Sequence, residues 1–468
     1  MQKTEPESLA RKVIELCADC DQCRDFMEDT PCLFFPQLYR LHDREKDHGK
    51  PITSAELRRL LDLCNMCGLC TCFNVRADIR HAKDAFVARD GLRPPTLRIL
   101  EDVQLVGTIC GSYPRLMNAL IENKVTAGAL KMLGGIHPAR KLPTWPPESF
   151  ARWARRRGLD QPSPATGRKV VYFAGCTAKY FFPEVGKATV GVLESNGVSV
   201  HCPELGCCGM PSLLEGDREF TLGLARSNLE RLDELVEDGY DIVSSCPTCG
   251  YVLKNMFSEG AYLSKEYRDK LKGEQDGKGA GDRKHSSATM GSERNKLPLP
   301  MALILAGMLQ DESYFVPLDG VKRINVSSHT YDLGEYLQIL NSSGDLNRDL
   351  GPVASRSAYY PPCHLKEQNM GQPWLDLLGL VPGLSMEKVG DQFDCCGMSG
   401  VMGFKREFHA VSLHIGNRLM DKIRSVNPER LLTECLSCRM QFNQALPYRV
   451  YHPVEILNEA YHSFRGLS

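Results

Sequence analysis

Cysteine is the residue through which this sequence could do chemistry. The 468-residue chain has 20 cysteines, and most of them stand at short, repeated intervals. Thiolates at such spacing bind metal ions or carry out redox reactions. Structural disulfides are typical of exported proteins, and the polar start MQKTEPESLARKVIEL has no apolar segment that would mark it for secretion. We therefore expect a cytoplasmic protein whose cysteines ligate metal.

Eight of the cysteines form two runs near the N-terminus. CADCDQCRDFMEDTPC covers residues 17–32 and CNMCGLCTC covers 64–72, and each places three cysteines at two-residue intervals with a fourth further on. In two-cluster ferredoxins such a run wraps three thiolates around one [4Fe-4S] cluster, and the fourth ligand comes from the other run. The spacing therefore predicts one cubane cluster on Cys17, Cys20, Cys23 and Cys72, and a second on Cys64, Cys67, Cys70 and Cys32.

Two features of these runs depart from the ferredoxin pattern. Leu33 and Phe73 stand where a proline usually follows the fourth cysteine, and only Thr71 separates Cys70 from Cys72. Zinc is the competing metal, because it also takes four thiolates at Cys-x2-Cys spacing. Zinc sites rarely have a third cysteine at the same interval, so the pattern favours iron and sulfide.

Ten further cysteines form two sets of five in the same order. Each set has a single cysteine, then an adjacent pair followed by glycine, then a Cys-x2-Cys motif. The sets are Cys176, Cys207, Cys208, Cys246 and Cys249, and Cys363, Cys395, Cys396, Cys435 and Cys438. Adjacent cysteines do not pair with one another without strain, whereas two thiolates on a glycine turn can bridge neighbouring metal ions. Five thiolates exceed what zinc or a cubane needs, so we expect a larger or irregular iron–sulfur cluster.

The segments around these two sets predict a duplicated α/β domain. Buried-strand patterns at 169–175, 198–204 and 240–246 alternate with helical patterns at 183–197 and 219–239. The same order returns at 357–363, 372–380, 384–390, 407–426 and 429–435, and the tails 324–337 and 448–460 also resemble each other. Alternating strands and helices indicate largely parallel sheets. In such sheets the loops after the strands meet at one edge, where the cysteines would lie.

We expect the chain to be divided into an N-terminal domain and two repeats. Residues 1–155, with helical patterns such as 54–63 and 114–133, predict an all-α, two-cluster ferredoxin-like domain. A linker at 156–169 follows, then repeat one at 170–340 and repeat two at 355–468.

Repeat one contains an insertion at 258–320. Its part 270–296 is polar and glycine-rich, which predicts a disordered or mobile loop. The apolar part 297–309 is too short to span a bilayer and predicts a segment that packs on the domain or against a partner or membrane surface.

The C-x(n)-CCG-x(n)-CxxC pattern, present twice, is similar to the CCG domain of the heterodisulfide reductase family. The stretches PPCHL at 361–365 and CCGMSGVMGF at 395–404 carry much of the likeness, which runs over nearly the whole chain except 258–320. The resemblance implies a noncubane [4Fe-4S] cluster on each complete set of five cysteines, so one or two such clusters besides the two cubanes. In disulfide-reducing members of the family the two clusters face one another, whereas many electron-transferring members have an incomplete first set.

Three residues outside these motifs complete the candidate site. His364, next to Cys363, could donate a hydrogen bond to a cluster sulfur or a proton to a product thiolate, or be a partly exposed loop histidine. Cys110 and Cys202 fall outside the eighteen expected ligands, and we expect each to be a free buried thiol, with Cys202 close enough to Cys207 to serve as a spare ligand.

The charge balance and the absence of a nucleotide-binding motif limit the functions that the sequence is compatible with. The 57 Lys and Arg against 58 Asp and Glu leave a net charge of −1, without a dense basic tract, so we expect no nucleic-acid partner. The chain also lacks a G-x-G-x-x-G after a strand, so hydride must enter through a partner. One hypothesis is an electron-transfer subunit that links a flavoprotein dehydrogenase to a quinone or membrane cytochrome, peripheral on the cytoplasmic face of the inner membrane. The alternative is a catalytic disulfide reductase subunit, which the completeness of both five-cysteine sets favours.

Overall fold

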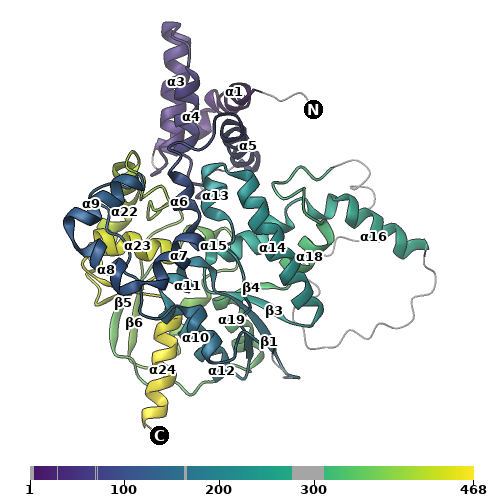
Figure 1. The fold of residues 1–468 in the computed structure, drawn as a ribbon, viewed down its shortest axis with the longest axis vertical. Helices are drawn as coiled ribbons and strands as arrows, with labels where there is room; N and C mark the ends of the chain where they lie inside the picture. Colours follow the sequence, from purple (N-terminus) through teal and green to yellow (C-terminus); the bar gives the residue numbers. More distant parts are fainter. Residues whose placement is uncertain are drawn as a thin grey trace.

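Two four-stranded sheets and a helical bundle make up the computed structural model, which describes residues 5–28, 30–68, 70, 72–162, 166–276 and 310–467. The sheets lie in the lower part of Figure 1 and the N-terminal helices stand above them. All six strand pairings in the described sheets are parallel. The prediction of a duplicated, parallel α/β fold is therefore confirmed.

The N-terminal helices pack around a hydrophobic core of their own. Leu57, Leu60 and Leu61 follow helical spacing, and each is 1% exposed. A capping box begins their helix, because the Thr53 side chain accepts a hydrogen bond from the Glu56 amide and the Glu56 carboxylate accepts one from the Thr53 amide. The helices are α1 (Pro6–Ala18), α2 (Asp21–Glu28), α3 (Phe34–His48), α4 (Ser54–Asp62) and α5 (Phe73–Asp90).

A second group of helices runs from this bundle along the repeats. Its members are α6 (Leu97–Glu101), α7 (Val103–Ser112), α8 (Pro114–Glu122), α9 (Lys124–Leu133) and α10 (Phe150–Arg156). The predicted helix at 114–133 is divided at Asn123, whose side chain accepts hydrogen bonds from the Val125 and Thr126 amides and so begins α9. Phe150 of α10 packs in one core with Tyr172 of repeat one. The described residues before 163 contain no strand, only an isolated bridge between Ile136 and Lys405.

Repeat one forms a sheet in the order β2-β1-β3-β4. Its strands are β1 (Lys169–Phe173), β2 (Ser199–His201), β3 (Asp241–Ser244) and β4 (Thr330–Asp332). The helices are α11 (Gly175–Tyr180), α12 (Pro183–Ser195), α13 (Met210–Glu215), α14 (Arg218–Glu237), α15 (Pro247–Gly250), the π-helix η1 (Tyr251–Met256), the 3-10 helix η2 (Ala261–Leu263), α16 (Lys265–Asp276), α18 (Gly320–Ser328) and α19 (Leu333–Ser343).

Repeat two forms a sheet in the matching order β6-β5-β7-β8. Its strands are β5 (Ser355–Tyr359), β6 (Leu384–Lys388), β7 (Arg430–Leu432) and β8 (Arg449–Tyr451). The helices are α20 (Cys363–Lys366), α21 (Pro373–Leu378), α22 (His409–Val426), α23 (Leu436–Ala445) and α24 (Pro453–Leu467). The equal strand order confirms the internal repeat.

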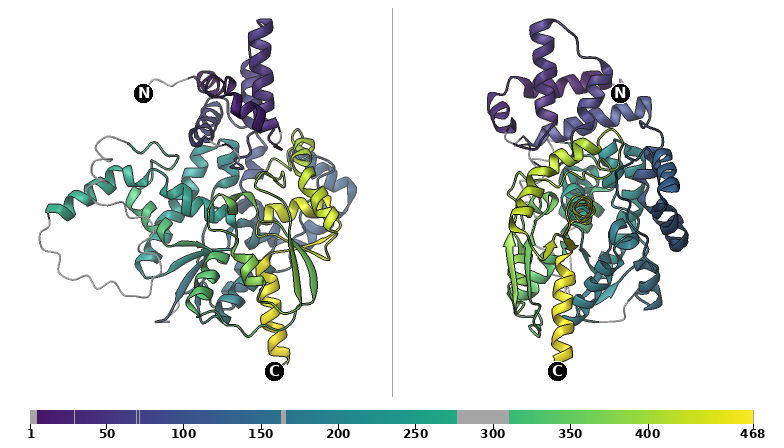
Figure 2. Two further views of the ribbon diagram at one scale, coloured as in Figure 1. Left: turned by 180° about the vertical axis from the view of Figure 1, so that it is seen from behind. Right: turned by 90° about the vertical axis from the view of Figure 1, so that its left-hand side faces the viewer.

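The two repeats share one hydrophobic core. Alternate residues of a strand point to opposite faces, so Tyr172 of β1 and Tyr359 of β5 enter this shared core, while Val171 and Ala358 face the helices on the outer sides. Helix α12 of repeat one packs on α24 of repeat two, and α19 packs on α21. Figure 2 shows the two sheets on opposite sides of α24. The repeats are therefore one packed body.

The structure differs from the predicted elements in three places. The tail of each repeat contributes a fourth strand of only three residues, too short for an alternating pattern to reveal. Strand β5 ends at Tyr359, before Pro361 and Pro362, because proline lacks the amide that a strand needs. Residues 270–276 of the predicted mobile loop are helical in α16, where Leu271 is buried. The rest of that loop and the apolar segment 297–309 lie outside the described residues.

Candidate metal centre

The strand order brings the cysteines of each repeat to the carboxyl edge of its sheet. Cys176 follows β1 in α11, Cys207 and Cys208 follow β2, and Cys246 follows β3 and begins α15. The cysteines of repeat two follow β5, β6 and β7 in the same way. Because β1 and β3 are neighbours with their connections on opposite sides, this edge is a topological switch point, where open α/β sheets bind ligands.

The five thiols of a repeat contact one another in a fixed order. In repeat one, side-chain hydrogen bonds link Cys176, Cys207, Cys208, Cys249 and Cys246 in turn. In repeat two they link Cys363, Cys395, Cys396, Cys438 and Cys435. Hydrogen bonds from Cys395 and Cys438 lower the pKa of Cys396 to about 6, so this sulfur readily becomes a thiolate, the form that binds metal.

A glycine with positive φ turns each cysteine pair toward the rest of its set. Gly209 has φ +88° and Gly397 has φ +81°, a conformation that side chains with a Cβ rarely adopt. A Cβ on Gly397 would also lie 2.0 Å from the Ser412 carbonyl oxygen. These constraints explain why both pairs are followed by glycine.

Both thiol sets line one cavity between the repeats. Its wall includes Cys67 from the N-terminal bundle and nine of the ten repeat cysteines: Cys176, Cys208, Cys246, Cys249, Cys363, Cys395, Cys396, Cys435 and Cys438. Hydrogen bonding from Cys438 lowers the pKa of Cys435, and the charge of Cys246 opposes this shift, so the two sets lie within electrostatic range of each other at these residues. The cavity thus joins three parts of the chain.

A second, smaller cavity lies inside the N-terminal bundle. Cys32, Cys64, Cys67 and Cys70 line it, together with Ile415 from repeat two. These four are the cysteines that spacing groups together, including Cys32 from the distant run.

The other four N-terminal cysteines also lie together. Burial, together with the charges of Cys23, Cys72 and Cys20, raises the pKa of Cys17 to about 12. Cys17 in turn acts on the pKa of Cys70, so the two N-terminal groups are neighbours. The structure therefore brings each predicted ligand group together, with Cys67 in the walls of both the bundle cavity and the central cavity.

His364 lies in the wall of the central cavity, where it is 7% exposed rather than partly exposed in a loop. Its Nδ1 lies 2.9 Å from the Thr248 hydroxyl and its Nε2 lies 3.3 Å from the Met66 carbonyl oxygen, while the ring stacks on Tyr251. A carbonyl only accepts, so Nε2 carries the proton and Nδ1 accepts from Thr248. Burial lowers the pKa of His364, in keeping with this neutral form. The ring thus connects the two repeats and the N-terminal bundle.

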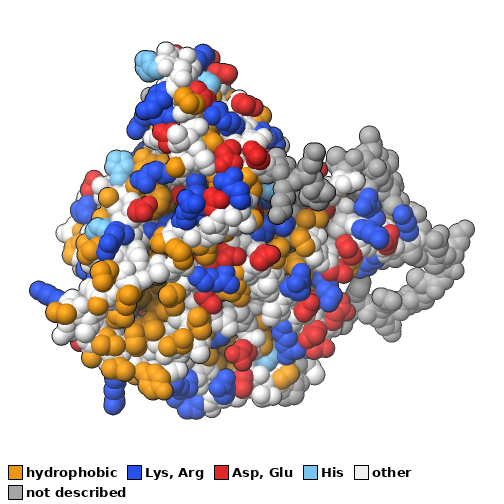
Figure 3. Space-filling view, turned by 45° about the horizontal axis from the view of Figure 1, so that its top comes forward, with side chains coloured by type: hydrophobic (Ala, Val, Ile, Leu, Met, Phe, Trp, Pro, Cys, Tyr) orange, Lys and Arg blue, Asp and Glu red, His pale blue; other side chains and the backbone are white. Residues whose placement is uncertain are grey.

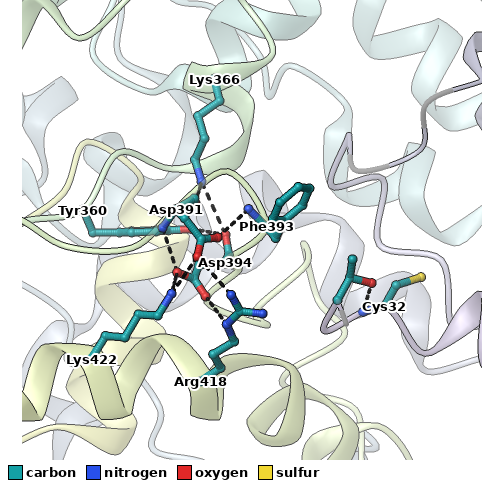
Figure 4. Close-up of polar contacts among 9 residues, drawn as sticks. Cys32, Tyr360, Lys366, Asp391, Phe393, Asp394, Arg418 and Lys422 are labelled. Carbon is teal, nitrogen blue, oxygen red and sulfur yellow. Dashed lines mark hydrogen bonds and ion pairs between the residues drawn. The ribbon is translucent and has the colours of Figure 1, made fainter. Parts of the chain in front are cut away.

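Charged residues that sequence patterns did not reveal hold the loop before Cys395 (Figure 4). The buried Asp394 carboxylate pairs with Lys422 at 2.7 Å and Arg418 at 3.3 Å, and Asp391 pairs with both cations as well. Lys366 donates a hydrogen bond of 2.7 Å to the Asp391 carbonyl oxygen. These contacts fasten the loop to α22, and only the proximity of Asp391 and Asp394 to the cysteine pair could have suggested them.

The two remaining cysteines lie apart from the thiol sets. Cys202 is buried, and burial raises its pKa to about 12, so it stays a thiol. It lines a surface pocket that also reaches Cys176 and Cys207. Cys110, in α7, is only partly buried, contrary to expectation, because much of that helix faces outward.

The thiols suit a multi-iron cluster better than a single ion. Among the described residues, no three His, Cys, Asp or Glu side chains are placed to hold one metal ion. Instead, buried sulfurs surround open volume from several sides. Soft thiolates around such a volume match the donor set of iron–sulfur clusters.

Comparison with known proteins identifies the repeats. The family described as CCG, Cysteine-rich domain, matches residues 170–254 and 357–443. The chain contains two CCG domains. Each match covers β1 to η1 or β5 to α23, the part that carries the five cysteines.

Three relatives resemble a larger part of the chain, at 23–24% identity. The C subunit of anaerobic glycerol-3-phosphate dehydrogenase from Escherichia coli is 24% identical over 370 residues, which cover 78% of either chain. The B subunit of fumarate reductase (CoM/CoB) from Methanothermobacter marburgensis is 23% identical over 62% of this chain and 45% of its own. An uncharacterized iron-sulfur protein of Methanococcus maripaludis is 24% identical over 59% of this chain and 42% of its own. The chain is thus homologous to subunits of a dehydrogenase and of a reductase.

Proposed function

We propose that this chain is the iron–sulfur electron-transfer subunit of a multi-subunit oxidoreductase. A flavoprotein dehydrogenase subunit supplies the electrons, and a quinone or membrane cytochrome receives them. The observation that carries the proposal is that Cys67 lines both the N-terminal cavity and the central cavity. A cluster held by Cys67 would stand directly between the outer N-terminal cysteines and the CCG sets. The names of the relatives, subunits of a dehydrogenase and of a reductase, support the same role.

Four clusters account for the eighteen grouped cysteines. A ferredoxin-like pair of cubanes would be held by Cys17, Cys20, Cys23 and Cys72 and by Cys64, Cys67, Cys70 and Cys32. Each CCG set would hold a noncubane [4Fe-4S] cluster. When bound, such clusters accept and release single electrons.

The surrounding residues position the thiolates and keep water away. The ten CCG cysteines are buried except Cys176 and Cys363, which are partly buried. His364 uses both ring nitrogens to join the repeats to the Met66 loop, so we assign it a positioning role. Because its ring is neutral, His364 holds the segments between Cys67 and the CCG sets together without adding charge to them.

A catalytic disulfide reductase subunit is the second candidate. Both thiol sets are complete and line one cavity, and Cys246 and Cys435 lie within electrostatic range of each other there. A disulfide bound in this cavity could receive one electron from each side. The two candidates differ in their substrate, not in their ligands.

Cysteine substitution and two acceptor assays test these proposals. Cys208→Ser and Cys396→Ser should each remove one EPR signal from anaerobically purified protein and leave the N-terminal signals intact. Cys110→Ser, which lies outside every thiol set, is the matched control and should leave all signals intact. Reduction of a quinone analogue by the dithionite-reduced protein favours the first candidate, and reduction of a thiol disulfide favours the second. Purified protein that holds zinc and no iron would refute both.

An apolar surface supports a peripheral position at the membrane. Large hydrophobic side chains on α6 to α9 are exposed, and Figure 3 shows hydrophobic side chains gathered on the corresponding face. They are Ile99, Leu105, Ile109, Tyr113, Leu116, Val125, Met132 and Leu133, which are 50–80% exposed. Arg115, Lys124 and Lys131 lie on the same helices and would complement anionic lipid headgroups. No helix among the described residues meets the length and hydropathy of a membrane span.

Vesicle binding tests this position. The protein should co-sediment with vesicles that contain anionic lipid, and a variant with both Ile109→Asp and Leu116→Asp should not. Leu16→Asp is the matched control, because Leu16 is 56% exposed on α1, away from this surface. Equal binding by all three proteins would contradict the proposal.

A further inference from the structure

Arg140 is a fully buried cation that reaches into repeat two from the segment between α9 and α10. Its side chain is 1% exposed. One guanidinium nitrogen donates a hydrogen bond of 2.6 Å to the Gln441 side-chain oxygen, and another lies 3.1 Å from the Met398 sulfur. The guanidinium also lies 4.7 Å from the centre of the Phe404 ring. Both polar contacts flank the thiol set, because Met398 follows Cys396 by two residues and Gln441 follows Cys438 by three.

Arg140 has no carboxylate partner among the described residues. The other arginine that is as deeply buried, Arg323, pairs with Asp311 at 2.6 Å. Arg140 instead lies beside the thiol set of repeat two, where it contacts Met398 and Gln441 and the charge of Cys396 acts on its pKa. Its Nε has no hydrogen-bond partner within the described chain. Burial lowers the pKa of Arg140 to about 10, which still leaves it charged at neutral pH.

A buried, unpaired guanidinium is costly, because taking a charge out of water requires compensation by an opposite charge. The neutral partners Gln441 and Met398 do not supply it. A [4Fe-4S] cluster with thiolate ligands carries net negative charge and would lie in the cavity that Cys396 and Met398 line. Such a cluster would supply the missing counter-charge.

Within the described part of repeat one, no arginine takes the corresponding place. The position that matches Gln441 is Val252, which is fully buried with Met210 and Leu213 in an apolar cluster. The lysines, in contrast, are matched: Lys179 and Lys366 each follow the first cysteine of their set by three residues, and each donates to a backbone carbonyl. Arg140 thus breaks the charge symmetry of two otherwise similar sites.

We propose that Arg140 is the fixed counter-charge of the repeat-two cluster and raises its reduction potential above the value that the cysteines alone would give. Reduction adds one negative charge to a cluster, and a buried positive charge nearby stabilises the reduced form. Repeat two is thereby the more favourable of the two CCG sites for an arriving electron. This inference rests on the proposed cluster in repeat two, and Arg140 acts as a positioning and tuning residue.

Potentiometric EPR titration of the complete, anaerobically purified protein tests the proposal. The repeat-two signal is first assigned as the one that Cys396→Ser removes. Arg140→Met, which keeps the volume but removes the charge, should shift the midpoint of this signal to a more negative potential and leave the other signals in place. Arg140→Lys, which keeps the charge, should stay close to the wild-type midpoint.

The outcomes separate this inference from the proposed function. An unchanged midpoint in Arg140→Met, with iron per chain at the wild-type value, overturns the role of Arg140 and leaves the cluster standing. Equal shifts in Arg140→Met and Arg140→Lys also overturn it, because charge would then not be the cause. If Arg140→Met loses the iron of one cluster while Arg140→Lys keeps it, the counter-charge role is supported, whereas loss in both variants counts against it. If Cys396→Ser removes no signal, the proposed cluster itself is wrong.

Discussion

The glycine after each cysteine pair offers a matched experiment, because the two repeats differ at this turn. Both glycines have positive φ, which costs a residue with a Cβ about 1–2 kcal/mol. At Gly397 a Cβ would lie 2.0 Å from the Ser412 carbonyl oxygen, a backbone atom of α22 that cannot rotate away. At Gly209 the nearest atom is the Thr221 methyl group at 3.1 Å, which can move. The same substitution should therefore have unequal effects.

We expect Gly209→Ala to lower the free energy of unfolding by about 1–2 kcal/mol, the cost of the backbone conformation alone. For Gly397→Ala the overpacking adds about 1–3 kcal/mol, so the total reaches about 2–5 kcal/mol. The clash should also displace Cys395 and Cys396, so this variant should lose the iron of repeat two.

Thermal unfolding and iron per chain, measured on the two alanine variants side by side, check this prediction. Gly223→Ala is a control for the substitution itself, since a Cβ at this helical glycine meets no atom within 4 Å. Equal losses at Gly209 and Gly397, or a Gly397→Ala protein with full iron content, would refute the reasoning from the turn geometry.

Two further predictions concern buried charge. Lys405 and Glu215 form a buried ion pair of 2.8 Å between the repeats. Lys405→Met should therefore destabilise the protein by about 3 kcal/mol, which is at the low end for a broken buried pair because Lys83 remains near Glu215. Denaturant unfolding measures this change, and an unchanged free energy of unfolding would contradict the prediction. Burial lowers the pKa of His452 to about 3, although its hydrogen bond to the Ser245 carbonyl oxygen raises it. The unfolded chain therefore binds a proton below about pH 6.5 that the folded chain does not, so stability should fall as the pH falls from about 6.5 toward 3. His452→Asn should flatten this part of the curve of melting temperature against pH. An unchanged slope would contradict the assignment.

Sequence patterns predicted the structure correctly where a feature depends only on residues that are close together in the chain. The continuous apolar runs of β1 and β3, and the glycine after each cysteine pair, are local properties, and they located the repeats and the sheet edge. The three-residue strands β4 and β8 were missed because they are held by pairing with β3 and β7, not by a pattern of their own. The polar composition of residues 270–276 predicts a loop, yet tertiary packing of Leu271 supports a helix there.

The residues that surround the thiol sets are held by contacts between segments far apart in the chain, and residue spacing does not predict such contacts. The grouping of Cys32 with Cys64, Cys67 and Cys70 followed from a motif, so the sequence contained it. Arg140 lies more than 250 residues from Met398 and Gln441, which it contacts, in a short polar stretch without periodicity. The partners of His364 come from the other repeat and from the N-terminal bundle. Only the packing of the two repeats creates such neighbours.

The two repeats differ in the surface pocket that reaches their cysteines, and this leads to a last prediction. The N-terminal bundle packs on both repeats: Met66 joins the core of repeat one, while in repeat two the Asn65 amide lies 3.8 Å from the Cys395 sulfur and Phe26 packs edge-on against Phe393 at 5.1 Å. In repeat one a surface pocket also reaches Cys176 and Cys207. An external oxidant should therefore meet the repeat-one cluster first.

Oxidation of the reduced protein by ferricyanide can measure this difference. The two CCG signals are assigned with Cys208→Ser and Cys396→Ser, and the signal that depends on Cys208 should decay faster. Ala151→Trp, which places a large side chain in the wall of the surface pocket, should slow that decay and leave the repeat-two signal unaffected. Equal decay rates in the wild type would mean that the surface pocket does not make the repeat-one cluster more accessible than the repeat-two cluster. A faster repeat-one signal would instead make repeat two the site that receives electrons within the chain, and repeat one the site that passes them on.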